Sequence, residues 1–431
     1  MATVTTMPKA PAPASAPARL RTLLIVLVTG CLAWGVVAGW TVSQHASAAD
    51  DVVGTSEPLS LDAQQLYRSL SDADITATTA FLSGVQERLA MRQRYTADIS
   101  GAAADLAALK AAESRAQAGR LSAIAAGLPV YTDYVARAVT WNAAGYQSPG
   151  ASFMQNASVE MHLVLLPAAR SIYAQESAQL RASSAEATGL PWIVVALVLA
   201  LIIGYGLLRT QRWVSLRTHR VVNYGLLGAT VVLLVGVIWL VAAFAVARGD
   251  LSKGVNHGSA PAETLAQADI AAAQARGDEV LNLISRSGDT SFEQDFAKVR
   301  AQLGPGHGTL LSTAAASSSG EPGARWVAAA GRDARTWYGV NQHLYSLDLA
   351  ANYAKETQLV VQSAPGSSAP EFSSLERDLG RAITADQVVF SSAASAGRDA
   401  FGGLEAGIIV VALLMAAGCA WGLSRRLAEY R

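Results

Sequence analysis

The chain has 431 residues, of which 51% are apolar, and its 33 acidic and 33 basic side chains give no net charge. The two cysteines, Cys31 and Cys419, offer neither a disulfide framework nor the spacing of a zinc site. Large polar segments must therefore be held together by packing. The overall neutrality also conceals an uneven distribution of charge along the chain.

Four long apolar stretches divide the sequence, at residues 23–42, 190–208, 221–246 and 404–423. Each is long enough to cross a bilayer as a helix. The first pair of stretches encloses one large polar segment, and the second pair encloses another. Both polar segments are therefore predicted to lie on the same side of the membrane.

The basic residues predict which side this is. They gather in the N-terminal tail, in the short loop between the second and third spans, and in the C-terminal tail, where Glu429 is the only carboxylate side chain. Because basic residues are retained on the cytoplasmic side, these three segments are predicted to be cytoplasmic. The two large segments then lie outside and carry a net negative charge.

The first apolar stretch has an alternative interpretation as a cleaved signal. The sequence from Val28 to Cys31 loosely fits a lipoprotein cleavage site behind a basic start. The apolar run continues through Val37 to Trp40, which favours an uncleaved helix with an aromatic anchor at the outer interface.

Apolar side chains recur at steps of three and four along the first outer segment, which predicts amphipathic helices. The three stripes are Leu66, Leu70, Ala73, Ala77 and Phe81; Leu121, Ile124, Leu128, Tyr131, Val135 and Val139; and Met154, Ala157, Met161, Val164, Ala168 and Ile172. With a further helix around Leu106, they predict an antiparallel four-helix bundle whose first and last helices continue into the membrane spans.

The second outer segment repeats this plan. The sequence around Asp74 resembles that around Asp269, as though both lay at the same distance into a first helix, and Trp141 corresponds in the same way to Trp337. We interpret this as an internal duplication of a span, bundle and span. Asp74 and Asp269 are either buried polar groups between helices or surface carboxylates, and the sequence does not decide between them.

The predicted fold class is an all-α multi-pass membrane protein with four transmembrane helices and two extracytoplasmic antiparallel four-helix bundles. The predicted order is a disordered cytoplasmic tail (1–22), transmembrane helix 1 (23–42), bundle 1 (47–188), transmembrane helix 2 (190–208), a basic cytoplasmic loop (209–220), transmembrane helix 3 (221–246), bundle 2 (248–403), transmembrane helix 4 (404–423) and a cytoplasmic tail (424–431).

No pattern that carries catalysis is present. The six histidines form no zinc-binding spacing, and there is no nucleophile elbow and no Cys-x-x-Cys motif. The predicted cytoplasmic pieces are too short to fold as a catalytic domain. We therefore expect no enzyme activity, no catalytic residue, no cofactor and no metal site. Transport is also disfavoured, because no span has an ionisable residue near its centre.

Two groups of residues are candidates for binding. Outside, Arg88, Arg92 and Arg94 beside Tyr95 are candidates for gripping an anionic ligand or a partner. The alternative is a solvated face on which these arginines exchange ion pairs with neighbouring carboxylates. Aromatic side chains at helical spacing, such as Trp337, are expected in the core rather than in a pocket.

Inside, the basic loop is the candidate for docking a cytoplasmic partner. Its candidate residues are Arg209, Arg212, Trp213, Arg217 and Arg220. The same arginines also serve as topology determinants and as contacts for anionic lipids, so the docking role is a hypothesis. Any output must nevertheless pass through this loop or the two tails.

The outer segments resemble the four-helix-bundle sensor domains of chemoreceptors. The residues that carry this resemblance are Leu128-Pro129-Val130-Tyr131-Thr132, Gly150, Asn156-Ala157-Ser158, Met161 and Leu165-Leu166-Pro167. The duplicated arrangement with almost no cytoplasmic part is more similar to GlnX-type four-span actinobacterial membrane proteins. That resemblance implies an extracytoplasmic amino-acid-binding lipoprotein and a cytoplasmic Ser/Thr kinase as partners.

The sequence thus favours a bacterial plasma-membrane signal transducer with both termini in the cytoplasm. It would contact the lipid bilayer and no nucleic acid, and a homo-oligomer is left open. The resemblance implies that it senses amino-acid availability through the lipoprotein and relays it to the kinase. The alternative is a structural envelope protein or membrane scaffold that senses no ligand.

Overall fold

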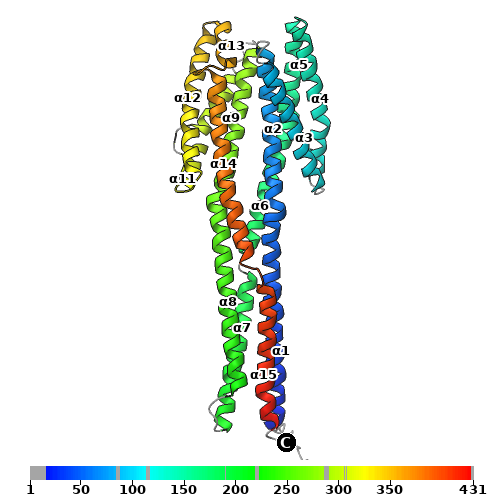
Figure 1. The fold of residues 1–431 in the computed structure, drawn as a ribbon, viewed down its shortest axis with the longest axis vertical. Coiled ribbons are helices and arrows are strands. Elements are labelled where there is room, and N and C mark those ends of the chain that lie inside the picture. The colour runs from blue at the N-terminus through cyan, green and yellow to red at the C-terminus, as the bar shows by residue number, and fades with distance from the viewer. Residues whose placement is uncertain are drawn as a thin grey trace, which may run out of the picture. The chain divides into compact units, whose positions relative to one another are not determined.

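The computed structural model describes residues 16–83, 88–112, 117–189, 191–218, 223–285, 291–304, 306 and 308–428. These residues are almost entirely helical and contain no strand. Four of the described helices are long and apolar enough to cross a membrane. The prediction of an all-α multi-pass membrane protein is confirmed (Figure 1).

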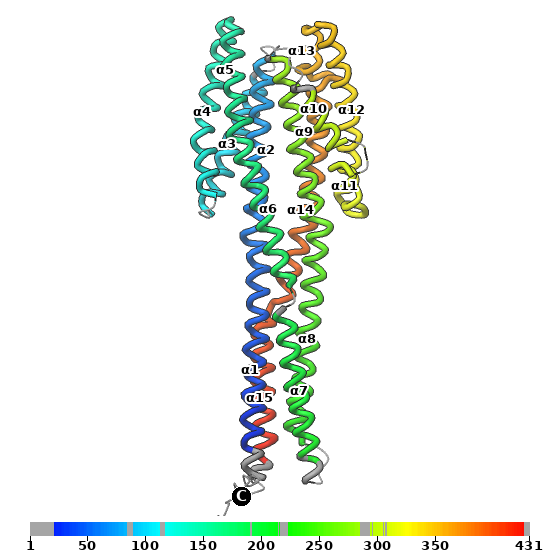
Figure 2. Tube along the Cα trace, turned by 180° about the vertical axis from the view of Figure 1, so that it is seen from behind, coloured from blue at the N-terminus to red at the C-terminus, as the bar shows by residue number. Residues whose placement is uncertain are grey.

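The chain forms two compact units. The membrane unit comprises Met1–Ala48, Glu186–Gly249 and Gly397–Arg431, and the bundle unit comprises Ala49–Ala185 and Asp250–Ala396. The four apolar helices of the membrane unit are α1 (Ala16–Asp51), α7 (Pro191–Thr218), α8 (Tyr224–Gly254) and α15 (Leu404–Ala428). Figure 2 shows the same helices from behind.

Small residues let the helices of the membrane unit approach closely. A Cβ atom at Gly225 of α8 would collide with the backbone of Gly418 and Gly422 of α15. Glycines at this spacing are typical of tightly packed transmembrane helices, since lipid itself gives helices no hydrophobic reason to associate. In the same unit, the Trp34 indole of α1 donates a hydrogen bond to the carbonyl oxygen of Ala196 in α7 (3.1 Å).

The first bundle has four helical legs, as the apolar stripes predict. The legs are α2 (Glu57–Leu82), α3 (Arg88–Ala111), α4 (Ala118–Ala143) and a last leg of α5 (Gln147–Glu160), η2 (Met161–Leu165) and α6 (Leu166–Thr188). Pro129 lies inside α4, which it does not end, and the turn after α4 has Gly145 with φ of 87°.

One of the predicted stripes is wrong at Val164, although its later member Ile172 is buried as predicted. Val164, predicted to face the core, is 36% exposed, whereas Leu165 and Ala169 are fully buried. The reason is η2, a π-helical segment, because its wider turn inserts one extra residue and moves the buried face along by one position. Sequence periodicity assumes a constant turn and therefore misses this shift.

The second bundle is more interrupted than the first. Its helices are α9 (Ala260–Ser285), α10 (Ser291–Leu303), α11 (Leu310–Ser317), α12 (Ala324–Leu349), α13 (Tyr353–Val361) and α14 (Ser368–Asp399). Two of its legs are divided, between α10 and α11 and between α13 and α14. Both divisions fall in the glycine- and proline-rich connections of the sequence.

Three π-helical segments share one sequence feature, a proline two residues beyond their last residue. The segments η1 (Val52–Ser56), η2 and η3 (Val255–Ser259) precede Pro58, Pro167 and Pro261, respectively. A proline inside a helix lacks an N–H group, and its ring collides with the carbonyl four residues earlier. A wider turn at that point accommodates the ring, so the helical run continues instead of breaking.

The two halves of the chain repeat the same order of helices, but the residues that correspond differ from the predicted ones. In both halves an apolar helix leads through a π-helical segment into a 26-residue helix, α2 or α9. Asp74 lies late in α2, whereas Asp269 lies early in α9, so these residues are not equivalent. Trp141 is likewise at the end of α4, whereas Trp337 is in the middle of α12. The short sequence similarities therefore do not mark equivalent positions in the two halves.

The two polar segments share one hydrophobic core within the bundle unit. Leu66 and Leu70 of α2 belong to the same buried cluster as Leu265 of α9, and α2 packs against α9. Ion pairs also join the two segments. In each pair an arginine from the first segment contacts a carboxylate from the second. The pairs are Arg68–Asp269 (3.8 Å), Arg94–Glu376 (3.4 Å) and Arg181–Glu263.

Candidate functional site

A pocket of about 380 Å³ opens between α2, α3 and α4 of the first bundle. Its wall is mostly apolar, with Phe81, Met91 and Val135 among its side chains, and Arg92 and Tyr95 add polar groups. This volume lies within the range of small-molecule sites, which combine apolar walls with a few polar groups. The pocket is therefore a candidate ligand site in the first bundle.

Arg92 supplies the positive charge of this pocket. Its side chain is exposed, and among the described residues no carboxylate pairs with it. Tyr95, one turn further along α3, has a buried hydroxyl group without a hydrogen-bond partner in the described structure. Burial raises the pKa of this tyrosine, which keeps its hydroxyl neutral. Arg92 therefore offers a guanidinium group to an anion in this pocket, beside the ring of Tyr95.

A buried polar cluster lies behind the pocket. Asp74 of α2 is 2% exposed, and its Oδ2 atom lies 3.1 Å from Nε2 of His162 in η2. Burial lowers the pKa of His162 and the hydrogen bond to Asp74 raises it, with a net rise above the ordinary value. Tyr131 is fully buried, with its ring 6.4 Å from that of Tyr95. Asp74 is thus a buried polar group between helices and not a surface carboxylate, the two alternatives that the sequence left open.

The structure separates the four predicted extracytoplasmic candidates. Arg92 and Tyr95 line the same pocket, whereas Arg94 points to Glu376 of α14 and so joins the two bundles. Arg88 is the first residue of α3, and its side chain lies outside the described residues. The alternative prediction, that these arginines form ion pairs, therefore holds for Arg94. Its partner, however, comes from the second bundle rather than from a neighbour in sequence.

The cytoplasmic candidates lie largely on a helix. α7 continues through Thr218, so Arg209, Arg212 and Trp213 are helical rather than part of a loop. Arg209 and Arg212 are exposed and Trp213 is half-buried. Residues three and four apart share a helix face, so these three side chains form one surface. Arg217 also belongs to α7, but its side chain and the whole of Arg220 are outside the described residues.

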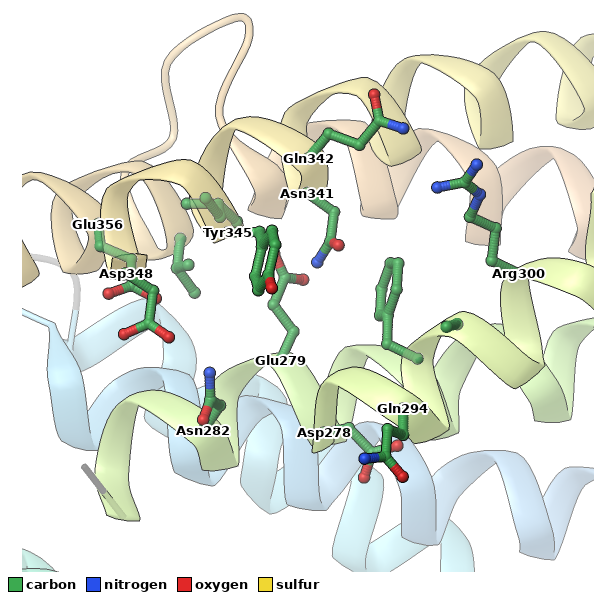
Figure 3. A pocket seen from close by; sticks show the side chains of 14 residues that line it. Asp278, Glu279, Asn282, Gln294, Arg300, Asn341, Gln342, Tyr345, Asp348 and Glu356 are labelled. Atoms are coloured by element: carbon green, nitrogen blue, oxygen red, sulfur yellow. The ribbon is translucent and has the colours of Figure 1, made fainter. Parts of the chain in front are cut away.

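A second pocket, which the sequence patterns did not reveal, lies in the second bundle. It has a volume of about 410 Å³ and is lined from α9, α10, α12 and α13 (Figure 3). Its polar residues are spread over four helices at no regular spacing, so no sequence motif could have indicated them. By contrast, Trp337 is fully buried, as expected for a core aromatic.

Comparison with known families gives one result. Residues 48–185 match an actinobacterial sensor domain. This sensor domain coincides with the first bundle, which contains the pocket with Arg92 and Tyr95. It supports an actinobacterial sensor protein with a sensing or signalling role. Comparison with curated proteins and with solved structures gave no match.

Proposed function

We propose that this protein is a plasma-membrane signal transducer that senses amino-acid availability outside the cell, through a solute-binding lipoprotein, and relays it to a cytoplasmic Ser/Thr kinase without catalysis of its own. The main support is the sensor domain at residues 48–185 and its covalent continuity with a membrane helix. One helical run extends from Arg21 to Leu82, so it includes both a span and the first leg of the bundle. The amino-acid signal and the two partners come from the resemblance to GlnX-type proteins.

The helical continuity suggests how a signal would travel. A displacement of α2 is passed to α1 because no loop separates them, and the second half has the same connection from α9 to α8. The π-helical segments η1 and η3 lie at these two connections, where a wide turn can change to an ordinary one. Such a change rotates and shifts one helical section relative to the next, a recognised class of switching movement.

The topology can be tested by cysteine accessibility. We expect Ser148→Cys and Ser319→Cys, both at exposed positions, to react with a membrane-impermeant thiol reagent in intact cells. Ser215→Cys in α7 should react only after permeabilisation. The background would be Cys31→Ala with Cys419→Ala, since both native cysteines are buried. Labelling of Ser215→Cys alone in intact cells would reverse the proposed orientation.

The relay can be tested on the cytoplasmic end of α7. Replacing Arg212, Trp213 and Arg217 by alanine should abolish co-purification of the kinase, since arginine and tryptophan supply much of the energy of small interfaces. Arg209 and Arg220 are kept to preserve the positive-inside signal.

The matched control replaces Gln211 and Ser215 of the same helix by alanine and should leave co-purification unchanged. A kinase signal that survives the triple variant, with correct topology and expression, would contradict relay through α7. It would favour output through the tails or the scaffold function instead.

A further inference from the structure

The pocket between α2, α3 and α4 of the first bundle has a single charged residue in its described lining. This residue is Arg92, and the lining includes no described aspartate, glutamate, lysine or histidine. Tyr95 also lines the pocket, but its hydroxyl group is buried and stays neutral. A ligand that enters this pocket therefore meets one positive charge and no negative one.

The described carboxylates nearest to this lining in sequence already interact with basic residues. The interactions are Asp74 with His162 (3.1 Å), Asp98 with Arg94, and Asp133 with Arg137 (2.8 Å). Arg92, by contrast, is exposed, and no carboxylate of the described residues pairs with it. Its positive charge is therefore available to a ligand.

The other walls of the pocket are apolar or already hydrogen-bonded. Phe81 and Val135 supply apolar surface, whereas the short side chains of Ala80 and Ala136 leave room for a ligand. The polar side chains of the walls donate hydrogen bonds to backbone carbonyl oxygens of the protein, and they are Thr96, Thr132, Thr140 and Asn142. The exposed polar group that remains to orient a ligand is the Arg92 guanidinium.

This combination disfavours several classes of ligand. A cation would be repelled by Arg92 and would find no carboxylate in the described lining. A zwitterion such as an amino acid would bring an ammonium group between the same walls, where it loses hydration and gains no counter-charge. A dianion would pair one of its charges and leave the other unpaired. A single carboxylate on an apolar body avoids all of these costs.

We propose that this pocket binds an apolar monocarboxylate, with its carboxylate at the Arg92 guanidinium and its hydrocarbon body between α2, α3 and α4. A guanidinium binds a carboxylate through two parallel hydrogen bonds, and the volume of about 380 Å³ suits a small organic acid. The site lies within the matched sensor domain, residues 48–185. It goes beyond the proposed function, because this ligand binds the chain directly and is not an amino acid.

Titration calorimetry on the full-length protein in nanodiscs tests this proposal with three compounds that share a phenylethyl group. They are 3-phenylpropionate, which has only a carboxylate, L-phenylalanine, which adds an ammonium group, and 2-phenylethylamine, which has only the ammonium group. We expect 3-phenylpropionate to bind most tightly, by about tenfold or more over L-phenylalanine. Empty nanodiscs measure the partition of each compound into lipid, which is subtracted.

The Arg92→Gln variant should weaken 3-phenylpropionate binding by about tenfold or more, because it removes a charge-assisted hydrogen bond. Arg92 is exposed, so its replacement is compatible with folding. Arg120→Gln is the matched control, since this exposed arginine of α4 lies outside the pocket lining. The control should leave the affinity unchanged.

Three results would each overturn the proposal. They are absence of 3-phenylpropionate binding at millimolar concentration, L-phenylalanine binding as tight as that of 3-phenylpropionate, and an unchanged affinity in Arg92→Gln. None of them bears on the kinase relay, which is measured by co-purification.

Discussion

The Arg276→Met variant is expected to unfold at a much lower temperature than the native protein. The side chain of Arg276 is 2% exposed and that of Glu279 is 4% exposed, and their charged groups lie 2.8 Å apart. Removing one partner of a buried ion pair leaves an uncompensated charge, which costs about 3–5 kcal/mol. That is a large fraction of the stability of an ordinary protein domain. Thermal unfolding of the full chain in detergent measures the loss.

Further hydrogen bonds make this position sensitive. Arg276 donates to the Ser368 hydroxyl (2.8 Å) and to the carbonyl oxygen of Val360 (3.0 Å), while the Trp337 indole also donates to Ser368 (3.0 Å). One guanidinium thus joins α9, the end of α13 and the start of α14. Its loss should loosen all three connections at once.

Two comparison variants separate charge from packing. Arg276→Met combined with Glu279→Gln should recover part of the lost stability, because no buried charge is then left unpaired. Arg332→Met, at an exposed site on α12, should change the unfolding temperature little. If Arg276→Met alone unfolds like the Arg332→Met control, the buried pair does not stabilise the bundle.

The helices could be predicted from the sequence because their cores repeat regularly. Leu66 and Leu70, and likewise Leu121 and Ile124, are fully buried, as the steps of three and four predict. The prediction failed at Val164, where the π-helical segment before Pro167 shifts the buried face. Pro58, Pro167 and Pro261 indicate where such a shift can occur. They do so only when a π-helical turn is considered, as well as a kink, as the effect of a proline inside a helix.

The contact between the bundles could not be predicted, because it depends on residues far apart in the chain. Asp269 resembled Asp74 in sequence, yet Asp269 lies 3.8 Å from Arg68 of the first segment, and Asp74 pairs with His162. The candidate site was found in part, since Arg92 and Tyr95 do share a pocket. Arg94, between them in sequence, leaves that pocket because successive helical residues point in different directions.

The carboxylates around Arg68 should make the bundle unit more stable in mild acid than at neutral pH. Asp72 of α2, Asp269 of α9 and Glu376 of α14 surround this one guanidinium, with Arg94 and Asp98 of α3 next to Glu376. Burial raises the pKa of Asp269 to about 6, with Arg68 opposing the rise and Glu376 adding to it. Burial and the charge of Glu376 also raise the pKa of Asp72 well above its usual range.

A carboxyl group with a raised pKa in the folded state holds its proton better when folded. Its contribution to stability is therefore complete below about pH 4 and is lost as the pH rises through about 6. For Asp269 the change corresponds to about two pKa units, on the order of 3 kcal/mol. Asp269→Asn mimics the protonated form, so it should flatten the dependence of the unfolding temperature on pH between about 5 and 7.5.

The matched control is Asp133→Asn, because the Asp133 side chain is 54% exposed and its pair with Arg137 lies on the surface. This variant should keep the pH dependence of the native protein. At the acid end, Asp269→Asn and the native protein should unfold at similar temperatures, since both then have an uncharged side chain at this position. At neutral pH the asparagine variant should be the more stable, because it no longer keeps an ionised carboxylate in a buried site near Glu376. If the stability of the native protein instead rose steadily with pH over this range, Arg68 would fully compensate the charges of the carboxylates around it. That result would contradict the prediction made from the burial of the site.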